Sequence, residues 1–270
     1  MKQISIPVFW ALLNGHFMQL WTVALLVAAG ILGGLANSIA GGASLITFPA
    51  MLSIGLNPVT ANATNSFALL PGNGLGALAD RESFPPRTGK FWSAIAVAVA
   101  GGLCGAILLL ATSTRVFGLL VPALIGAATL IFTFSKQIRG GLAAALKGAE
   151  GHPAVRLVLL FVAAIYNGYF GAGVGVIFLA MLTATGHEEL RTANAFKNAL
   201  AFISNIGGVL VYLLSGAISF QHGFIMMVGA AIGGLAGGRL VKLLQPQLVR
   251  NIITACGAVM TCVYVYRFWL

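Results

Sequence analysis

Long apolar runs with very few charges constrain this chain more than any other feature. Of its 270 residues, 59% are hydrophobic and only 7% are charged, and the mean hydropathy is +0.97. Soluble domains carry about 25% charged residues, whereas apolar runs of about 20 residues are typical of transmembrane helices. Strands of a membrane β-barrel would alternate polar and apolar residues, and these runs do not. The sequence therefore predicts an all-α polytopic membrane protein, with the lipid bilayer as a partner.

We distinguish ten apolar segments, two of which are too short to cross a bilayer as straight helices. The short segments, 43–56 and 173–186, cover about 21 Å each at 1.5 Å per residue, against a hydrocarbon core of about 30 Å. Each follows a glycine-rich break, so we expect an interrupted or re-entrant helix at both places. The ten segments are 18–38, 43–56, 58–79, 91–111, 116–135, 155–171, 173–186, 190–215, 220–238 and 248–268.

The two halves of the chain resemble each other. Asn37 and Gly41 recur as Asn167 and Gly171, and the triplets Ala-Met-Leu and Thr-Ala-Asn occur in the same order in both halves. Ordered recurrence of this kind indicates an internal duplication. We therefore expect a first membrane repeat over 18–135, a cytoplasmic linker over 136–154 and a second repeat over 155–268.

Lysine and arginine indicate how the repeats are oriented. The loops 81–90 and 136–156 are rich in both residues, which is typical of the cytoplasmic side. If each half crosses the membrane five times, the second repeat is inverted, and Arg239, Lys242 and Arg250 also lie on the cytoplasmic side. If the short segments were re-entrant instead, these three residues would lie on the outer side. Arg267 fits this arrangement less well. Inverted five-segment repeats with broken helices at matching positions are typical of secondary transporters, which bind substrate near the midplane.

The charged residues exclude several functions. The net charge of +10 is spread thinly over short loops, so it indicates topology and not nucleic-acid binding. The three cysteines lie in apolar runs without metal-ligand spacing, and we expect no metal and no cofactor. All five acidic residues and all four histidines fall in loops or at segment ends. Because a cation transporter usually needs a carboxylate at mid-depth, an anion is the better substrate.

A polar stripe lies on one face of segment 190–215. Lys197 shares that face with asparagines at helical spacing, and segment 58–79 carries a matching stripe. The lysine has an alternative role, since its stem can return the ammonium to the cytoplasmic interface. The asparagines have one as well, since amides hydrogen-bond across helix bundles. The stripes comprise Asn194, Lys197, Asn198 and Asn205 in the second half, and Asn62, Asn65, Ser66 and Asn73 in the first.

The glycine breaks add hydroxyls and backbone N–H groups to these stripes. Helix N-termini opened by glycine carry partial positive charge, which suits an anion. Close helix packing is the alternative role for the same glycines. The expected substrate-binding residues are Lys197, Asn198, Asn194, Asn62, Asn65, Ser66, Asn37, Ser38, Gly41, Gly42, Ser44, Asn167, Tyr169, Gly171 and Gly173.

Four motifs resemble the sulfite exporter TauE/SafE family of bacterial membrane permeases. They are ANSIAGGASLITFPAML at 36–52, NPVTANATNS at 57–66, YFGAGVGV at 169–176 and RTANAFKN at 191–198, and the resemblance covers about 20–268. It implies a permease or exporter of sulfite and organosulfonates such as sulfoacetate. It also implies that both glycine breaks and the pair Lys197-Asn198 belong to the site. The first break is shorter than the usual glycine run, and Asn65 stands as an insertion between Thr64 and Ser66.

We therefore expect a non-enzymatic exporter of sulfite or small organosulfonate anions in the bacterial inner membrane. Transport of another small anion or carboxylate, coupled to an ion, is the alternative. A membrane enzyme would need a cluster of His, Asp or Glu facing water, and the loops offer only isolated ones. A membrane subunit without transport activity is a further alternative, and the sequence is also compatible with a homodimer.

Overall fold

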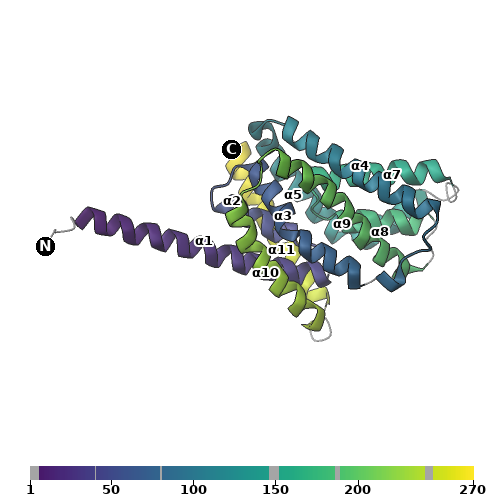
Figure 1. The fold of residues 1–270 in the computed structure, drawn as a ribbon, viewed down its shortest axis with the longest axis horizontal. Coiled ribbons are helices and arrows are strands. Elements are labelled where there is room, and N and C mark those ends of the chain that lie inside the picture. The colour runs from purple at the N-terminus through teal and green to yellow at the C-terminus, as the bar shows by residue number, and fades with distance from the viewer. Residues whose placement is uncertain (1–5, 40, 80, 146–151, 186–188, 241–245) are drawn as a thin grey trace.

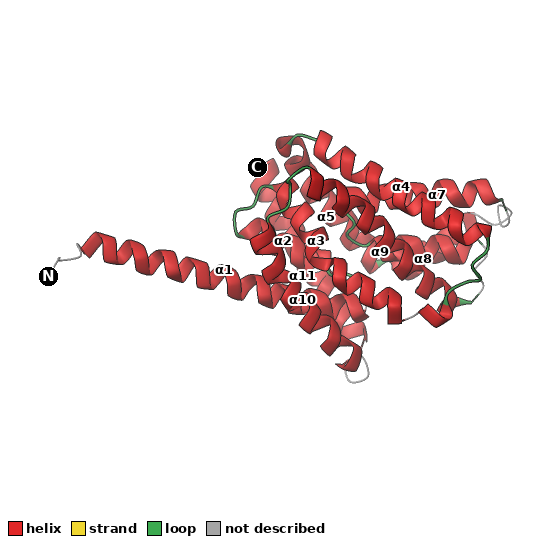
Figure 2. Ribbon diagram, in the orientation of Figure 1, coloured by secondary structure: helices red, strands yellow, loops and turns green. Residues whose placement is uncertain are grey.

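The chain is helical throughout the part that the structure describes. The computed structural model describes residues 6–39, 41–79, 81–145, 152–185, 189–240 and 246–270, and these ranges contain helices and no strand (Figure 2). The helices are α1 (Ile6–Ile39), α2 (Ser44–Ser53), α3 (Pro58–Ala79), α4 (Gly89–Ala111), α5 (Thr114–Thr133), α6 (Ser135–Ala145), α7 (Pro153–Tyr169), α8 (Val174–Ala184), α9 (Leu190–Leu214), α10 (Phe220–Leu240) and α11 (Pro246–Trp269), with a short 3₁₀ turn at Arg81–Ser83.

Five helices are long and apolar enough to cross a membrane, namely α1, α4, α5, α9 and α11. α3 has 22 residues, but asparagine, glycine and proline lower its hydropathy. This composition agrees with a polytopic membrane protein, while ten crossings and an inverted repeat stay predictions. Two bounds differ from expectation. α1 begins at Ile6, extends outward from the bundle (Figure 1), and is therefore longer than segment 18–38. The helix α6 begins at Ser135, the last residue of the expected first repeat, and covers the first part of the expected cytoplasmic linker 136–154.

The two glycine breaks have the same local geometry. Gly41 follows α1 with φ +78° and donates its N–H to the Ala36 carbonyl at 3.0 Å. Gly171 follows α7 with φ +77° and donates to the Tyr166 carbonyl, also at 3.0 Å. A left-handed backbone costs other residues about 1–2 kcal/mol, so glycine ends both helices here. The short helices expected after the breaks, α2 and α8, then begin at Ser44 and Val174.

Small residues allow the helices of two pairs to cross closely. α1 packs on α10, and α4 packs on α7 (Figure 1). A Cβ on Gly34 would lie 2.2 Å from the Ala230 carbonyl oxygen, and a Cβ on Gly105 would lie 2.1 Å from that of Ile165. Only glycine permits such approach, as is common between membrane helices. Between these pairs, α3 packs against α9, and each of the two also contacts one of the short helices, α2 or α8.

Candidate functional site

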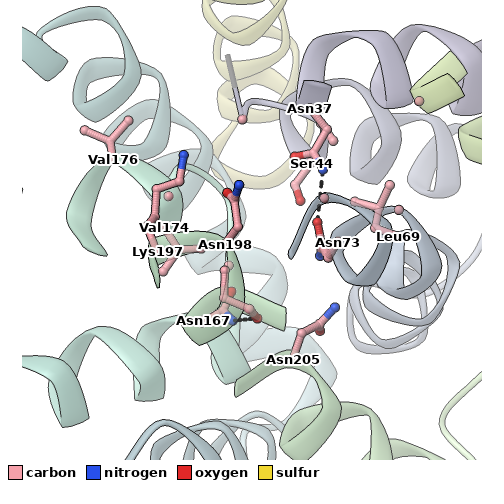
Figure 3. Close-up of a pocket in the computed structure, with 18 of the residues that line it drawn as sticks. Asn37, Ser44, Leu69, Asn73, Asn167, Val174, Val176, Lys197, Asn198 and Asn205 are labelled. Atoms are coloured by element: carbon pink, nitrogen blue, oxygen red, sulfur yellow. Dashed lines mark hydrogen bonds between the residues drawn. The ribbon is translucent and has the colours of Figure 1, made fainter. Parts of the chain in front are cut away.

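A polar cavity of about 780 Å³ lies between the two halves of the chain. Figure 3 shows Lys197 and Asn198 on one side of it, and Asn37, Ser44 and Asn73 on the other. Seven asparagines from α1, α3, α7 and α9 are the shared feature of its lining: Asn37, Asn65, Asn73, Asn167, Asn194, Asn198 and Asn205. Both short helices also border it, through Ser44 of α2 and Val174 of α8. The cavity therefore lies where the two breaks and the two polar stripes meet.

Lys197 borders this cavity from α9. Its ammonium donates a hydrogen bond to the Asn194 side-chain oxygen at 2.8 Å. Its stem runs beside the start of α8, since a Cβ added to Gly175 would lie 3.8 Å from the lysine Cδ. The side chain is half-buried. The charge is thus held next to the second break and reaches back toward the start of α9.

Arg139 brings a second cation to the cavity, and sequence reasoning missed it. Arg139 and Ser135 both line the cavity from α6, one helical turn apart and hence on one face. Lys136 on the same helix is exposed and does not line it. Among the described lining residues there is no Asp or Glu. Two cations without a carboxylate make the cavity electrostatically favourable for anions.

Several of the asparagines also hold helices together. Asn37 of α1 donates to the Asn73 side-chain oxygen of α3 at 3.0 Å. Asn167 of α7 donates to the Ala201 carbonyl of α9 at 3.0 Å. Asn205 of α9 donates to the Ser66 carbonyl of α3 at 3.1 Å. All three bonds join two helices at the cavity wall. These three amides therefore connect helices and also line the cavity.

Two asparagines of α3 carry side-chain oxygens that are buried without a hydrogen-bond donor. Asn65 is 1% exposed and its amide nitrogen lies 3.4 Å from the Ser44 hydroxyl. Asn62 is fully buried and its amide nitrogen donates to the Tyr169 carbonyl at 3.0 Å. The Oδ1 atoms of both have no partner. A buried acceptor without a donor costs about 1–3 kcal/mol, and one such acceptor lies near each break.

Comparison with known families matches residues 26–264 to "Sulfite exporter TauE/SafE". The chain belongs to the TauE/SafE family. A probable membrane transporter protein of Haemophilus influenzae is 29% identical over 251 residues, 90% of this chain and 94% of the relative. YfcA of Escherichia coli K12, also named a probable membrane transporter, is 29% identical over 90% of both chains. The Sinorhizobium protein ORF9, so named as well, is 30% identical over 92% of this chain and 96% of its own. No solved structure matches the chain.

Most of the expected site residues of this TauE/SafE chain do meet at the cavity. The described lining includes Lys197, Asn198, Asn194, Asn65, Ser66, Asn37, Gly41, Ser44, Asn167 and Gly171, but not Asn62, Gly42, Tyr169 or Gly173. The side chain of Ser38 lies outside the described residues. Ser135, Arg139, Asn73 and Asn205 also line it and were not among the expected binding residues. Spacing alone signalled Asn73 and Asn205, because they continue the two stripes.

Two of the expected residues that do not line the cavity stabilise the packing of the helices. Asn62 holds α3 to the end of α7 through the Tyr169 carbonyl. A Cβ on Gly42 would lie 2.9 Å from Ile253, so this glycine serves close packing. The backbone N–H groups at the breaks are also partly occupied, since Leu45 donates to the Gly42 carbonyl at 3.1 Å and Val176 to that of Gly173 at 3.0 Å. The breaks therefore offer positive helix ends more than free donors.

Proposed function

We propose that this chain is a secondary transporter that exports sulfite or a small organosulfonate anion across the bacterial inner membrane. One observation carries the proposal: the cavity combines two cations and seven amides, with no carboxylate among its described lining. Charge compensation and hydrogen-bond donors are both required when an anion leaves water. Membership of the TauE/SafE family and relatives named as probable membrane transporters support transport as the activity.

Each part of the cavity has a place in this mechanism. Lys197 offsets one negative charge of the substrate, and Arg139 attracts the anion at the α6 side. The amides of Asn194 and Asn198 face the substrate from α9, and that of Asn73 faces it from α3. The positive ends of α2 and α8 add partial charge without a titratable group. The oxygens of an ionised sulfonate or sulfite accept hydrogen bonds, which matches this set of donors.

Alternating access in this account relies on an inverted repeat. The packing supports it, because exchanging α1–α5 for α7–α11 maps one set of contacts onto the other. α1 packs on α10 as α7 packs on α4, and α2 packs on α3 as α8 packs on α9. The pairs α3 with α9 and α5 with α11 map onto themselves. The matched breaks at Gly41 and Gly171 obey the same exchange.

Orientation supports export. The segment 136–156 is basic and is expected on the cytoplasmic side, so Arg139 and the α6 edge of the cavity are expected there as well. An anion entering from the cytoplasm leaves an inside-negative cell downhill, by about 2.3 kcal/mol per charge per 100 mV. Such an exporter needs no acidic residue to couple transport to a proton gradient, and the described lining contains no Asp or Glu.

A second candidate is ion-coupled transport of another small anion or carboxylate. The observation that favours it is the pair of buried, unpartnered Oδ1 atoms on Asn62 and Asn65. The two residues lie one helical turn apart on α3, and side-chain carbonyl oxygens are ligands of hard cations. A sodium ion held there would link anion movement to the sodium gradient.

Flux into proteoliposomes separates the two candidates. The purified chain is tested with labelled sulfite, sulfoacetate and acetate under imposed potentials, with and without a sodium gradient. We expect sulfite or sulfoacetate to move, to follow the potential and to ignore sodium. Movement of acetate that requires sodium would favour the second candidate. Absence of any flux of the two sulfur anions would contradict the proposed substrate class.

A further inference from the structure

A second, much smaller cavity lies at the ends of three helices, away from the transport cavity. Its volume is about 70 Å³, and it shares no lining residue with the large one. It lies where α4 and α7 begin and where α8 ends. Its lining residues are Lys90, Ser93, His152, Pro153, Arg156, Leu157 and Thr185.

Basic side chains from two helices converge on this cavity. Lys90 comes from the first turn of α4, His152 is the residue before α7, and Arg156 lies in the first turn of α7. Arg156 is half-buried, and its Nε is enclosed without a hydrogen-bond acceptor. No Asp or Glu is among the described lining residues. Two cations and an imidazole held together without a counter-charge are stabilised by an anion.

The other groups around the cavity point to the same ligand chemistry. The Ser93 hydroxyl donates to the Lys90 carbonyl at 3.1 Å, and the Thr185 hydroxyl donates to the Met181 carbonyl at 2.8 Å. Their hydrogens are thus engaged by the backbone, and the available donors are those of the basic side chains. The starts of α4 and α7 add two positive helix ends, which favour phosphate-like groups.

The size and surroundings of the cavity restrict the class of ligand further. A cavity of about 70 Å³ has room for a few water molecules, each of which needs about 10–15 Å³ of such volume, and hence for one small oxyanion. Large apolar side chains follow the basic residues along the same two helices: Trp92 is 58% exposed, Val158 61% and Val162 58%. In a membrane, exposed apolar side chains contact lipid tails, and tryptophan favours the level of the head groups.

We propose that this cavity binds the phosphate group of an anionic lipid head group or a free phosphate ion, through Arg156, Lys90 and His152. The Arg156 guanidinium contributes a charge with no carboxylate beside it among the described lining, and Lys90 and His152, both exposed, contribute charge at the open side. The basic loops expected on the cytoplasmic side place this cavity at the leaflet whose surface is anionic. This site is independent of the transport cavity and of its substrate.

Native mass spectrometry of the purified, delipidated chain tests the proposal. The probes are phosphatidylglycerol, phosphatidylcholine and inorganic phosphate, compared across wild type, Arg156→Gln and Lys90→Gln. Arg87→Gln is the matched control, because Arg87 is an exposed arginine in the loop before α4 and does not line the cavity. Melting temperatures in detergent verify that each variant is folded, and Lys90 is exposed, so its replacement leaves the fold intact.

We expect one phosphatidylglycerol to bind wild type more tightly than phosphatidylcholine does. Arg156→Gln and Lys90→Gln weaken that binding by about tenfold, the loss of one charged hydrogen bond, and Arg87→Gln leaves it unchanged. If inorganic phosphate raises the melting temperature of wild type but not of Arg156→Gln, and the lipid is not retained, the ligand is free phosphate. Equal binding in wild type and Lys90→Gln, or an equal loss in Arg87→Gln, would overturn the proposal.

Discussion

Replacing Gly102 by alanine tests whether close helix packing sets the stability of this fold. Gly102 lies on α4 against α9, and a Cβ there would lie 2.0 Å from the Ser204 carbonyl oxygen. Carbon–oxygen contacts are not closer than about 3.3 Å, so α4 and α9 have to separate by roughly 1 Å. Overpacking of this kind costs about 1–3 kcal/mol. At about 2–4 °C per kcal/mol, we expect Gly102→Ala to lower the melting temperature by about 2–12 °C.

The same substitution at an open position is the control. Gly140 lies in α6, and a Cβ added there has nothing within 4 Å. Alanine favours an exposed helix by up to about 1 kcal/mol over glycine, so Gly140→Ala is expected to keep or raise the melting temperature. Both variants are purified in one detergent and melted side by side. If Gly102→Ala melts at or above the wild-type temperature, the packing argument is wrong.

Three further predictions follow from particular contacts. Arg139→Gln removes a cation from the cavity lining, and we expect it to weaken the binding of a small sulfonate roughly tenfold in a titration. Lys136 is exposed on the same helix, so Lys136→Gln is expected to leave the binding unchanged. Gly171→Ala lowers the melting temperature more than Gly41→Ala, because both have positive φ but only Gly171 would place a Cβ 2.9 Å from Asn167 Oδ1; equal losses would contradict this. Asn205→Ala removes the buried 3.1 Å bond to the Ser66 carbonyl and costs about 1–3 kcal/mol, which a melting temperature equal to that of wild type would refute.

Hydropathy and periodicity predicted the apolar helices and the polar stripes, but not α6. Both are local properties: apolar runs specify helices, and spacing of three or four residues specifies a shared face. Gly41 and Gly171 were predicted as breaks for the same reason, since a left-handed backbone there depends on the glycine itself. The asparagines on α9 accordingly meet those of α3 at one cavity (Figure 3).

The sequence did not predict features that depend on distant partners. α6 has a weakly apolar sequence with two glycines, so it was interpreted as part of a linker, yet it is a helix that packs on α8 and brings Arg139 to the cavity. The close contact of Gly34 with Ala230 could not be predicted either, because the two residues lie on helices far apart in the sequence. Asn62 shares the stripe of α3 but lies deep enough to bond the Tyr169 carbonyl. Spacing identifies a face of a helix, whereas depth along the helix decides which residue reaches the cavity.

Anion flux in the Lys197→Met variant shows whether the cavity binds anions with the help of a cation. Methionine keeps a long unbranched stem and removes the charge beside the second break. Sulfite and sulfoacetate fluxes are measured in proteoliposomes at several imposed potentials, with Lys136→Met as the control for loss of a charge outside the cavity. We expect wild type and Lys136→Met to carry the anion and a folded Lys197→Met to lose at least about 90% of the flux, since an uncompensated charge in the cavity costs more than 1.4 kcal/mol. Equal flux in all three would show that Lys197 serves only the interface and that the account of the cavity as a cation-assisted anion site is wrong.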